Sequence, residues 1–165
     1  MTGPACSSTT FAYHRGVAPM AWVLFGLASI ELVVVHLLVA LRWPWLAWPL
    51  TALTAASLAW IVLWIRSMAR LPHMLGEGSL LLRAGSLRQI SVPLGAISVV
   101  RRSWPPGAHK EAGVRNLVPL AYPNRMLVLS PPLADRRPVH AVMIRLDDPA
   151  AFDAGLAAQG VRFED

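Results

Sequence analysis

The chain has 165 residues, of which 55% are hydrophobic and 15% are charged, and its formal net charge is +6. Soluble domains usually carry about 25% charged residues, so this composition indicates a membrane protein with a small soluble part. The single cysteine, Cys6, excludes a disulfide framework and a cysteine-based metal site. The length leaves room for one membrane module and one domain of about 90 residues.

The positive charge bears on possible partners. Fourteen of the 15 basic residues are arginines, and together with the many alanines and prolines they suggest a bacterial genome rich in G and C. A net charge of +6 could favour nucleic acid. Because the charge lies beside long apolar runs, anionic lipid headgroups or membrane topology explain it more simply, and we expect no nucleic-acid partner.

Two apolar runs follow a polar segment, residues 1–16, which we expect to be a flexible cytoplasmic tail. The runs extend from Val17 to Leu41 and from Trp45 to Ile65, and each is long enough to cross a hydrocarbon core of about 30 Å. The sequence "RWPW" between them leaves room only for a tight turn, where Pro44 interrupts the helix. Residues 17–66 are therefore predicted to form an antiparallel hairpin of two transmembrane helices.

Arginines and tryptophans indicate how the hairpin lies in the membrane. The turn holds only Arg42, whereas Arg15, Arg66 and Arg70 flank the opposite end. The positive-inside rule then predicts a multi-pass protein of the bacterial inner membrane with both termini in the cytoplasm. A signal peptide explains the first run less well, because the run is long, lacks a cleavage pattern and is followed at once by a second run. Two interfacial clusters of tryptophan support the placement: Trp43, Trp45 and Trp48 at the turn, and Trp22, Trp60 and Trp64 towards the other end.

Residues 76–165 have a different pattern, which predicts a small cytoplasmic domain. Short runs rich in Leu, Val and Ile alternate with turns, and "RQISVPL" and "HAVMIRL" alternate polar and apolar residues as half-buried strands do. We expect five to seven strands, with Gly85 at positive φ in a hairpin turn. A final helix should begin with Asp148 as its N-cap and end at Gly160. Its expected buried stripe comprises Phe152, Leu156 and Ala157.

The hairpin, followed by "LLLRAGSLRQISVPLGAISVV" and "VMIRLDDPAAFDAGL", resembles bacterial membrane proteins that carry a pleckstrin-homology-like (PH-like) domain. The resemblance covers roughly residues 18 to 160 and is carried by the strand pair that leads into residues 92–97 and by the final helix. It implies a small α+β domain, a curled antiparallel β-barrel or sandwich capped by the C-terminal helix. It also implies a membrane-anchored binding or scaffold module with no known chemistry. Residues 104–124 depart from the pattern, and no fold is predicted for them.

Glu31 and His36 are costly groups for a membrane span. A charged carboxylate near the middle of the bilayer costs about 2.5–3.5 kcal/mol, so we expect Glu31 to be protonated or paired across a helix interface. The two residues lie about 140° apart around a helix and cannot pair directly. The second span offers Thr51, Thr54 and Ser57 as partners. In an antiparallel hairpin Glu31 should lie at the depth of Thr54 to Ser57, and His36 near Thr51.

Three interpretations of these intramembrane polar residues stay open. The simplest is a polar contact that holds the hairpin or a homo-oligomer together. The second is recognition of a membrane-protein partner. The third is proton or metal chemistry at Glu31, which needs more polar residues than two short spans provide unless the protein oligomerises.

The basic residues are the second candidate site. Between residues 66 and 145 twelve Arg and Lys stand against three acids, whereas residues 146–165 are acidic. The basic part could face anionic lipid, at about 1 kcal/mol per close cation, or could simply be a solvated face. The family resemblance adds that Arg83 and Arg88 flank the first hairpin turn, where eukaryotic relatives of the fold hold phosphoinositides, although their dense basic motif is absent here. The candidate lipid or partner surface comprises Arg66, Arg70, Arg83, Arg88, Arg101 and Arg102.

Catalytic patterns do not emerge from the sequence. The five histidines are scattered, and no HExxH, GxSxG or P-loop pattern occurs. We therefore expect a non-enzymatic, membrane-anchored interaction or scaffold protein, without cofactor or metal, that assembles with a membrane-protein partner or with itself. The main alternative is a sensor of anionic membrane surfaces that uses the arginine-rich domain.

Overall fold

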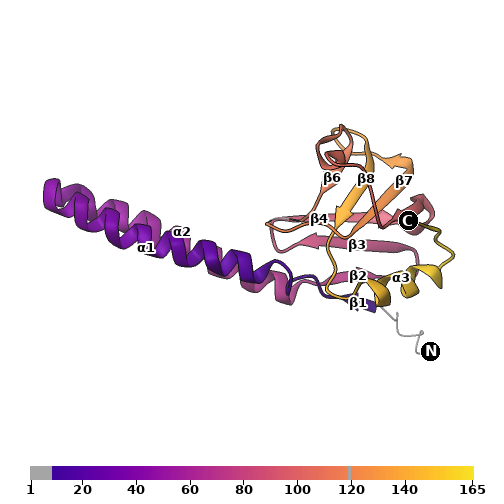
Figure 1. Ribbon diagram of the computed structural model, residues 1–165, viewed down its shortest axis with the longest axis horizontal. Helices are drawn as coiled ribbons and strands as arrows, with labels where there is room; N and C mark the ends of the chain where they lie inside the picture. The colour runs from indigo at the N-terminus through magenta and orange to yellow at the C-terminus, as the bar shows by residue number, and fades with distance from the viewer. Residues whose placement is uncertain (1–8, 119) are drawn as a thin grey trace, which may run out of the picture.

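The computed structural model describes residues 9–118 and 120–165 and consists of a long helical hairpin with a β-domain at its base (Figure 1). Helix α1 spans Ala18–Arg42 and helix α2 spans Pro44–Arg70. Trp43 alone separates them, ending α1 and beginning α2. Pro44 occupies the first position of α2, where a missing N–H costs no helical hydrogen bond. The predicted pair of apolar helices joined by a tight turn is confirmed.

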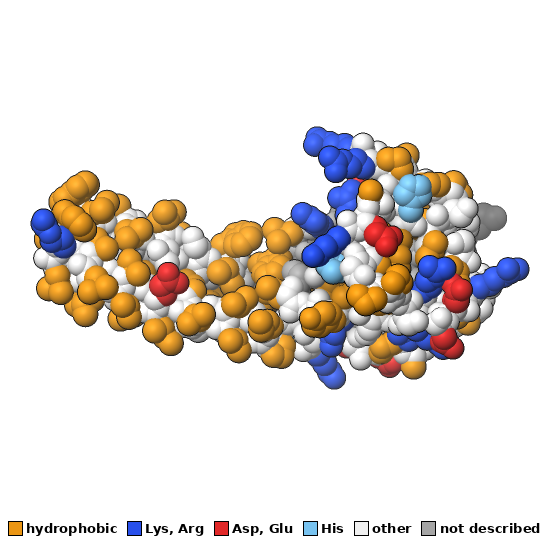
Figure 2. Space-filling model, turned by 45° about the horizontal axis from the view of Figure 1, so that its top comes forward, with side chains coloured by type: hydrophobic (Ala, Val, Ile, Leu, Met, Phe, Trp, Pro, Cys, Tyr) orange, Lys and Arg blue, Asp and Glu red, His pale blue; other side chains and the backbone are white. Residues whose placement is uncertain are grey.

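The hairpin helices are hardly buried. Ala21 is the buried residue of α1, and Ala47, Ile65 and Met68 are those of α2. Both helices are long and apolar enough to cross a membrane. Hydrophobic side chains extend along the face of the hairpin seen in Figure 2, whereas the core helix of a soluble domain would be mostly buried. An exposed apolar surface of this extent requires lipid or protein to cover it.

The domain contains two sheets that enclose one core. The first sheet has the order β1-β2-β3-β4, and its neighbouring strands are antiparallel. The second has the order β6-β8-β7-β5-β9. The first sheet consists of β1 (Thr9–Phe11), β2 (His73–Leu75), β3 (Ser79–Ala84) and β4 (Arg88–Pro93). The second consists of β5 (Ile97–Arg101), β6 (Val114–Asn116), β7 (Arg125–Leu133), β8 (Val139–Ile144) and β9 (Phe163–Glu164), and two 3-10 turns, η1 (Leu94–Ala96) and η2 (Ala108–Lys110), lie between strands.

The expectation of a purely antiparallel sheet is wrong at two edges. Strand β6 runs parallel to β8, and β9 runs parallel to β5. In both cases a long stretch of chain separates the parallel neighbours: residues 117–138, including β7, lie between β6 and β8, and residues 102–162, including helix α3 (Pro149–Ala157), lie between β5 and β9. A parallel neighbour requires such a crossover, whereas a tight hairpin can produce only an antiparallel one.

Helix α3 closes the core, largely as predicted. The Asp148 carboxylate accepts a hydrogen bond from the Ala151 N–H (3.0 Å), which caps the helix. Phe152 and Leu156 are fully buried among side chains of both sheets. Ala157 was expected in the buried stripe but is exposed, because the nine-residue helix ends there and turns its last position to solvent.

Residues 9–16 belong to the folded domain, although residues 1–16 were predicted to be a flexible tail. Strand β1 pairs with β2, so that Thr9 lies opposite Leu75 and Phe11 opposite His73. Phe11 packs edge-on against Phe152, with 5.1 Å between ring centroids. The chain therefore leaves the domain through β1, passes along the hairpin and returns through β2. The rest of the predicted tail, residues 1–8, lies outside the described residues.

Candidate functional site at the hairpin and its base

His36 joins the two helices within the hairpin. Its Nδ1 hydrogen-bonds to the Thr51 hydroxyl, and that hydroxyl donates to the Ala47 carbonyl at 2.8 Å. Because the hydroxyl proton is used there, the His36 Nδ1–H is the donor to Thr51. The Trp48 ring meets the imidazole edge-on, with 5.8 Å between centroids. The predicted proximity of His36 and Thr51 is confirmed, and His36 is an internal contact of the hairpin.

Thr54 and Ser57 do not reach across to Glu31, contrary to the expectation from the sequence. The Thr54 hydroxyl donates to the Leu50 carbonyl, and the Ser57 hydroxyl donates to the Leu53 carbonyl, each at 3.0 Å. Both groups thus bond to their own helix, as hydroxyls inside helices commonly do. The depth of Thr54 and Ser57 in the hairpin follows from the sequence, but the direction of their hydroxyl groups does not, because it depends on how each helix is rotated about its axis.

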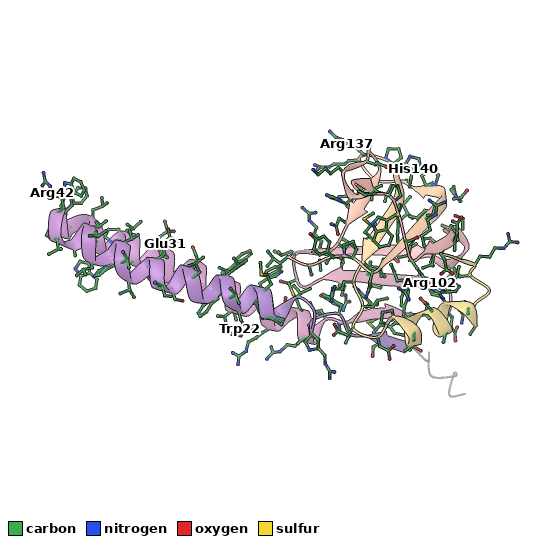
Figure 3. The ribbon with its side chains drawn as sticks, viewed as in Figure 1. Trp22, Glu31, Arg42, Arg102, Arg137 and His140 are labelled. Atoms are coloured by element: carbon green, nitrogen blue, oxygen red, sulfur yellow. The ribbon has the colours of Figure 1, made fainter. Side chains whose placement is uncertain are left out.

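Glu31 lies on the outer surface of the hairpin (Figure 3). Its side chain is exposed, and within residues 9–118 and 120–165 it makes no hydrogen bond or ion pair. It is the single acidic residue between positions 18 and 70. The hairpin by itself therefore leaves one ionisable group facing whatever surrounds the helices.

The six candidate arginines fall into two groups. In the described part of the chain, Arg66, Arg70, Arg83 and Arg88 form no ion pair. Arg101 pairs with Glu164 at 2.8 Å, and Arg102 pairs with Asp165 at 3.0 Å and with Asp153 at 3.3 Å. Arg102 lies on the side of the domain remote from the hairpin (Figure 3). Arg101 and Arg102 are therefore paired with acidic residues of α3 and of the C-terminus, whereas the other four arginines of the predicted lipid or partner surface make no such pair within the described residues.

The turn between β3 and β4 docks the domain onto the base of the hairpin. The Gly85 N–H donates to the Tyr13 hydroxyl at 2.6 Å, and the Ser86 N–H donates to the Ser67 hydroxyl of α2 at 3.0 Å. Gly85 has φ +58°, and a Cβ at this position would lie 2.8 Å from the Ser67 Oγ. Glycine is thus required both by the predicted positive φ and by this close approach, which the sequence did not indicate.

Asp147 provides a second attachment between the start of the hairpin and the domain. Its carboxylate accepts hydrogen bonds from the Arg15 N–H at 3.0 Å and the Gly16 N–H at 3.3 Å. Close by, Tyr13, Val17 and Met68 form a small buried cluster between the domain and both helices. The hairpin therefore has several fixed contacts with the domain, and no local sequence motif predicted them.

His73 is a buried titratable group at this joint. The side chain is 2% exposed, stacks on the Tyr13 ring with 4.4 Å between centroids, and accepts a hydrogen bond from the Arg83 N–H at Nδ1 (3.1 Å). Burial lowers the pKa of His73 to about 4, although a backbone hydrogen bond at Arg145 and the charge of Asp147 oppose the shift. The imidazole is therefore neutral near pH 7.

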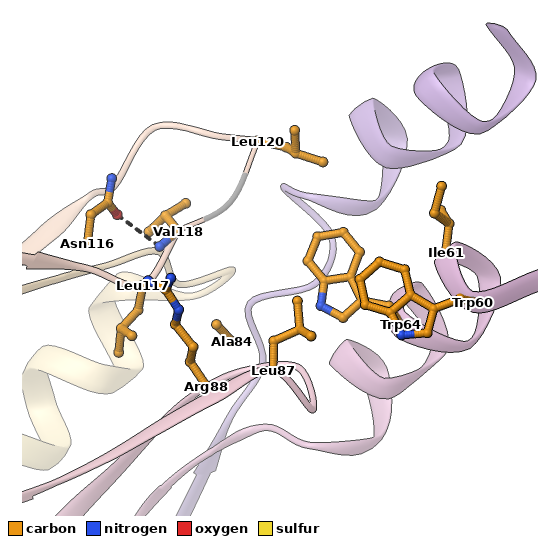
Figure 4. Close-up of a pocket in the computed structure, with 10 residues that line it drawn as sticks. All are labelled: Trp60, Ile61, Trp64, Ala84, Leu87, Arg88, Asn116, Leu117, Val118 and Leu120. Atoms are coloured by element: carbon orange, nitrogen blue, oxygen red, sulfur yellow. Dashed lines mark hydrogen bonds between the residues drawn. The ribbon is translucent and has the colours of Figure 1, made fainter. Parts of the chain in front are cut away.

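A pocket of about 480 Å³ lies between the hairpin and the domain (Figure 4). A second pocket of about 480 Å³ adjoins it at the β3–β4 turn and shares Leu87 and Arg88 with it. One has an apolar wall that includes Trp60 and Trp64, whose rings stack with 6.4 Å between centroids. The other is more polar and is lined by Arg83 as well as Arg88. Within the described residues, no three His, Cys, Asp or Glu side chains are grouped to hold a metal ion.

Comparison with known proteins adds no relative: no family model, curated protein or solved structure matches this chain. The class that the structure itself defines is a β-domain of two sheets and one helix, joined at its base to a hairpin of two helices of membrane-spanning length.

Proposed function

We propose that this chain is a non-enzymatic membrane protein that anchors a PH-like domain at the bacterial inner membrane and assembles there with other membrane-embedded helices. The exposed Glu31 on the hairpin carries the proposal. An ionisable group facing lipid is unfavourable by about 2.5–3.5 kcal/mol if charged. A helix from a second copy or a partner that offers a hydrogen-bonding group would remove that cost.

The connections of the hairpin support the proposed topology. Strand β1 precedes α1 and pairs with β2, which follows α2. A hairpin that crosses the bilayer therefore has residues 9–16 and the domain on one side, where Arg15, Arg66 and Arg70 also lie, and the turn with Arg42 on the other. By the positive-inside rule the domain side is the cytoplasm.

The assembly role predicts that Glu31→Ala weakens a specific contact in the membrane. Crosslinking with mass spectrometry on the tagged full-length protein in native membranes should capture a discrete partner or a second copy, and the yield should fall about 3- to 30-fold in the variant. Ser57→Ala is the matched control, because the Ser57 hydroxyl is also exposed on the hairpin but bonds to its own helix. Equal capture by all three proteins would contradict the proposal.

A second candidate function is sensing of anionic lipid, favoured by the unpaired arginines beside the two cavities at the hairpin base. The double variant Arg83→Gln/Arg88→Gln should lower the affinity of the full-length protein for phosphatidylglycerol about 10- to 30-fold, because each close cation contributes about 1 kcal/mol. Native mass spectrometry of lipid retained in detergent measures this, with phosphatidylcholine as reference lipid. Arg137→Gln, remote from the hairpin in Figure 3, should retain the wild-type affinity. If Arg137→Gln lowered the affinity for phosphatidylglycerol as much as the double variant, the attraction would be a general effect of positive charge and not specific to Arg83 and Arg88.

A further inference from the structure

We propose that two copies of this chain pack in parallel along α1, through a heptad seam with Glu31 at its centre, so that the two Glu31 carboxyl groups hydrogen-bond to each other. This inference rests on the proposed function, because it names the helix that covers the Glu31 face.

The seam is a row of exposed side chains with the spacing of a coiled coil. Counting from Glu31, exposed aliphatic residues recur at alternating intervals of three and four positions in both directions. Their exposed fractions range from 39% to 77%. The alternation of three and four is the pattern by which parallel helices interlock side chains along a shared seam. The row comprises Leu24, Leu27, Glu31, Val34, Leu38 and Leu41.

The contact within the hairpin leaves this row free. Helix α1 meets α2 through a different face, on which His36 bonds to Thr51. His36 lies about 140° around the helix from Glu31, so a second helix can pack on the seam without displacing α2. A bundle of hairpins is therefore compatible with the fold of each one.

A second copy fits the seam better than an unrelated apolar helix because of the carboxyl group. Copies inserted with the same topology are parallel, and a parallel pair in register places each residue opposite its own counterpart. At the central layer this gives two carboxyl groups, of which a protonated one donates an O–H···O bond to the other. Every other layer pairs aliphatic side chains. A single polar layer in an apolar seam also sets the register, since any shift would leave both carboxyl groups without a partner.

The first test maps the seam in purified full-length protein reconstituted in liposomes, where no other protein is present. In a Cys6→Ser background, single cysteines are introduced on the seam at Leu27, Val34 and Leu38 and off the seam at Val33 and Leu37. The off-seam positions are equally exposed, at 67% and 59%. We expect short-range disulfide crosslinking at the seam positions to exceed that at the off-seam positions at least about tenfold. Equal crosslinking at both sets would overturn the seam.

The second test concerns the carboxyl pair, with Val34→Cys as reporter. Glu31→Leu should reduce crosslinked dimer about 3- to 30-fold, the range for one interhelical hydrogen bond in a membrane, whereas Glu31→Gln should retain it because paired amides also hydrogen-bond. An unchanged dimer in Glu31→Leu would overturn the role of Glu31. If the purified protein stays monomeric while native membranes yield a different partner that depends on Glu31, the second copy is refuted and the proposed assembly function stands.

Discussion

Phe152→Ala should lower the free energy of unfolding of the β-domain by about 3–5 kcal/mol, the usual cost of truncating a fully buried phenylalanine. Phe152 is fully buried on α3 and contacts Phe11 of β1 at 5.1 Å between ring centroids. The cavity would therefore weaken the attachment of α3 and of the strand that precedes the hairpin. Urea unfolding of the full-length protein in detergent, followed by hydrogen exchange of β7 and β8, measures the change.

Two controls separate this loss of packing from a general loss of helix α3. Gln159→Ala changes an exposed residue just beyond the helix and should alter stability by less than about 0.5 kcal/mol. Phe152→Leu keeps an apolar side chain in the cavity and should cost clearly less than alanine. If Phe152→Ala changed the free energy of unfolding as little as Gln159→Ala, α3 would not close the core.

Acidification should destabilise the domain through His73 by about 3 kcal/mol between pH 6.5 and pH 4. Burial holds the pKa of the folded imidazole at about 4, whereas the value for an unfolded histidine is 6.5. Between these two pH values the unfolded chain binds the extra proton and the folded chain does not. Stability therefore falls as the pH drops below 6.5, and this contribution levels off below pH 4.

The measurement compares urea midpoints of the full-length protein at pH 7 and pH 4.5 with those of His73→Asn. The asparagine oxygen can replace Nδ1 as acceptor for the Arg83 N–H, but it does not titrate. The variant should be less stable at pH 7 and should lack most of the additional loss at pH 4.5. His140→Asn, at an exposed position of β8, controls for the removal of an imidazole. If His73→Asn lost as much stability between pH 7 and pH 4.5 as the wild-type protein, the acid sensitivity would arise from other groups.

Patterns confined to neighbouring residues predicted a large part of this structure. The two apolar runs and Pro44 specified two helices and a tight turn, because helix length and interruption depend on local composition. Gly85 specified a turn at positive φ, and Asp148 specified the N-terminus of α3, since both effects involve groups only a few residues apart.

Contacts between distant segments were not predictable in the same way. Strand β1 is three residues long and pairs with a strand beyond the hairpin, so it has no amphipathic pattern of its own. The Asp147 carboxylate bonds to the Arg15 and Gly16 N–H groups, and Tyr13 bonds to the Gly85 turn, only because the domain brings these segments together. The ion pairs of Arg101 and Arg102 were not predictable for the same reason, because their partners Glu164 and Asp165 lie far away in the sequence.

Glu31 shows most clearly where local pattern stops and three-dimensional arrangement begins. Its residue type, its depth in an apolar run and its angular separation from His36 follow from the order of residues and the helical repeat. Its direction does not, because the rotation of α1 depends on which of its faces packs against α2. That packing turns His36 inwards to Thr51 and leaves Glu31 outside. A polar group in a span is thus visible in the sequence, but whether the same chain satisfies it depends on how its helices pack.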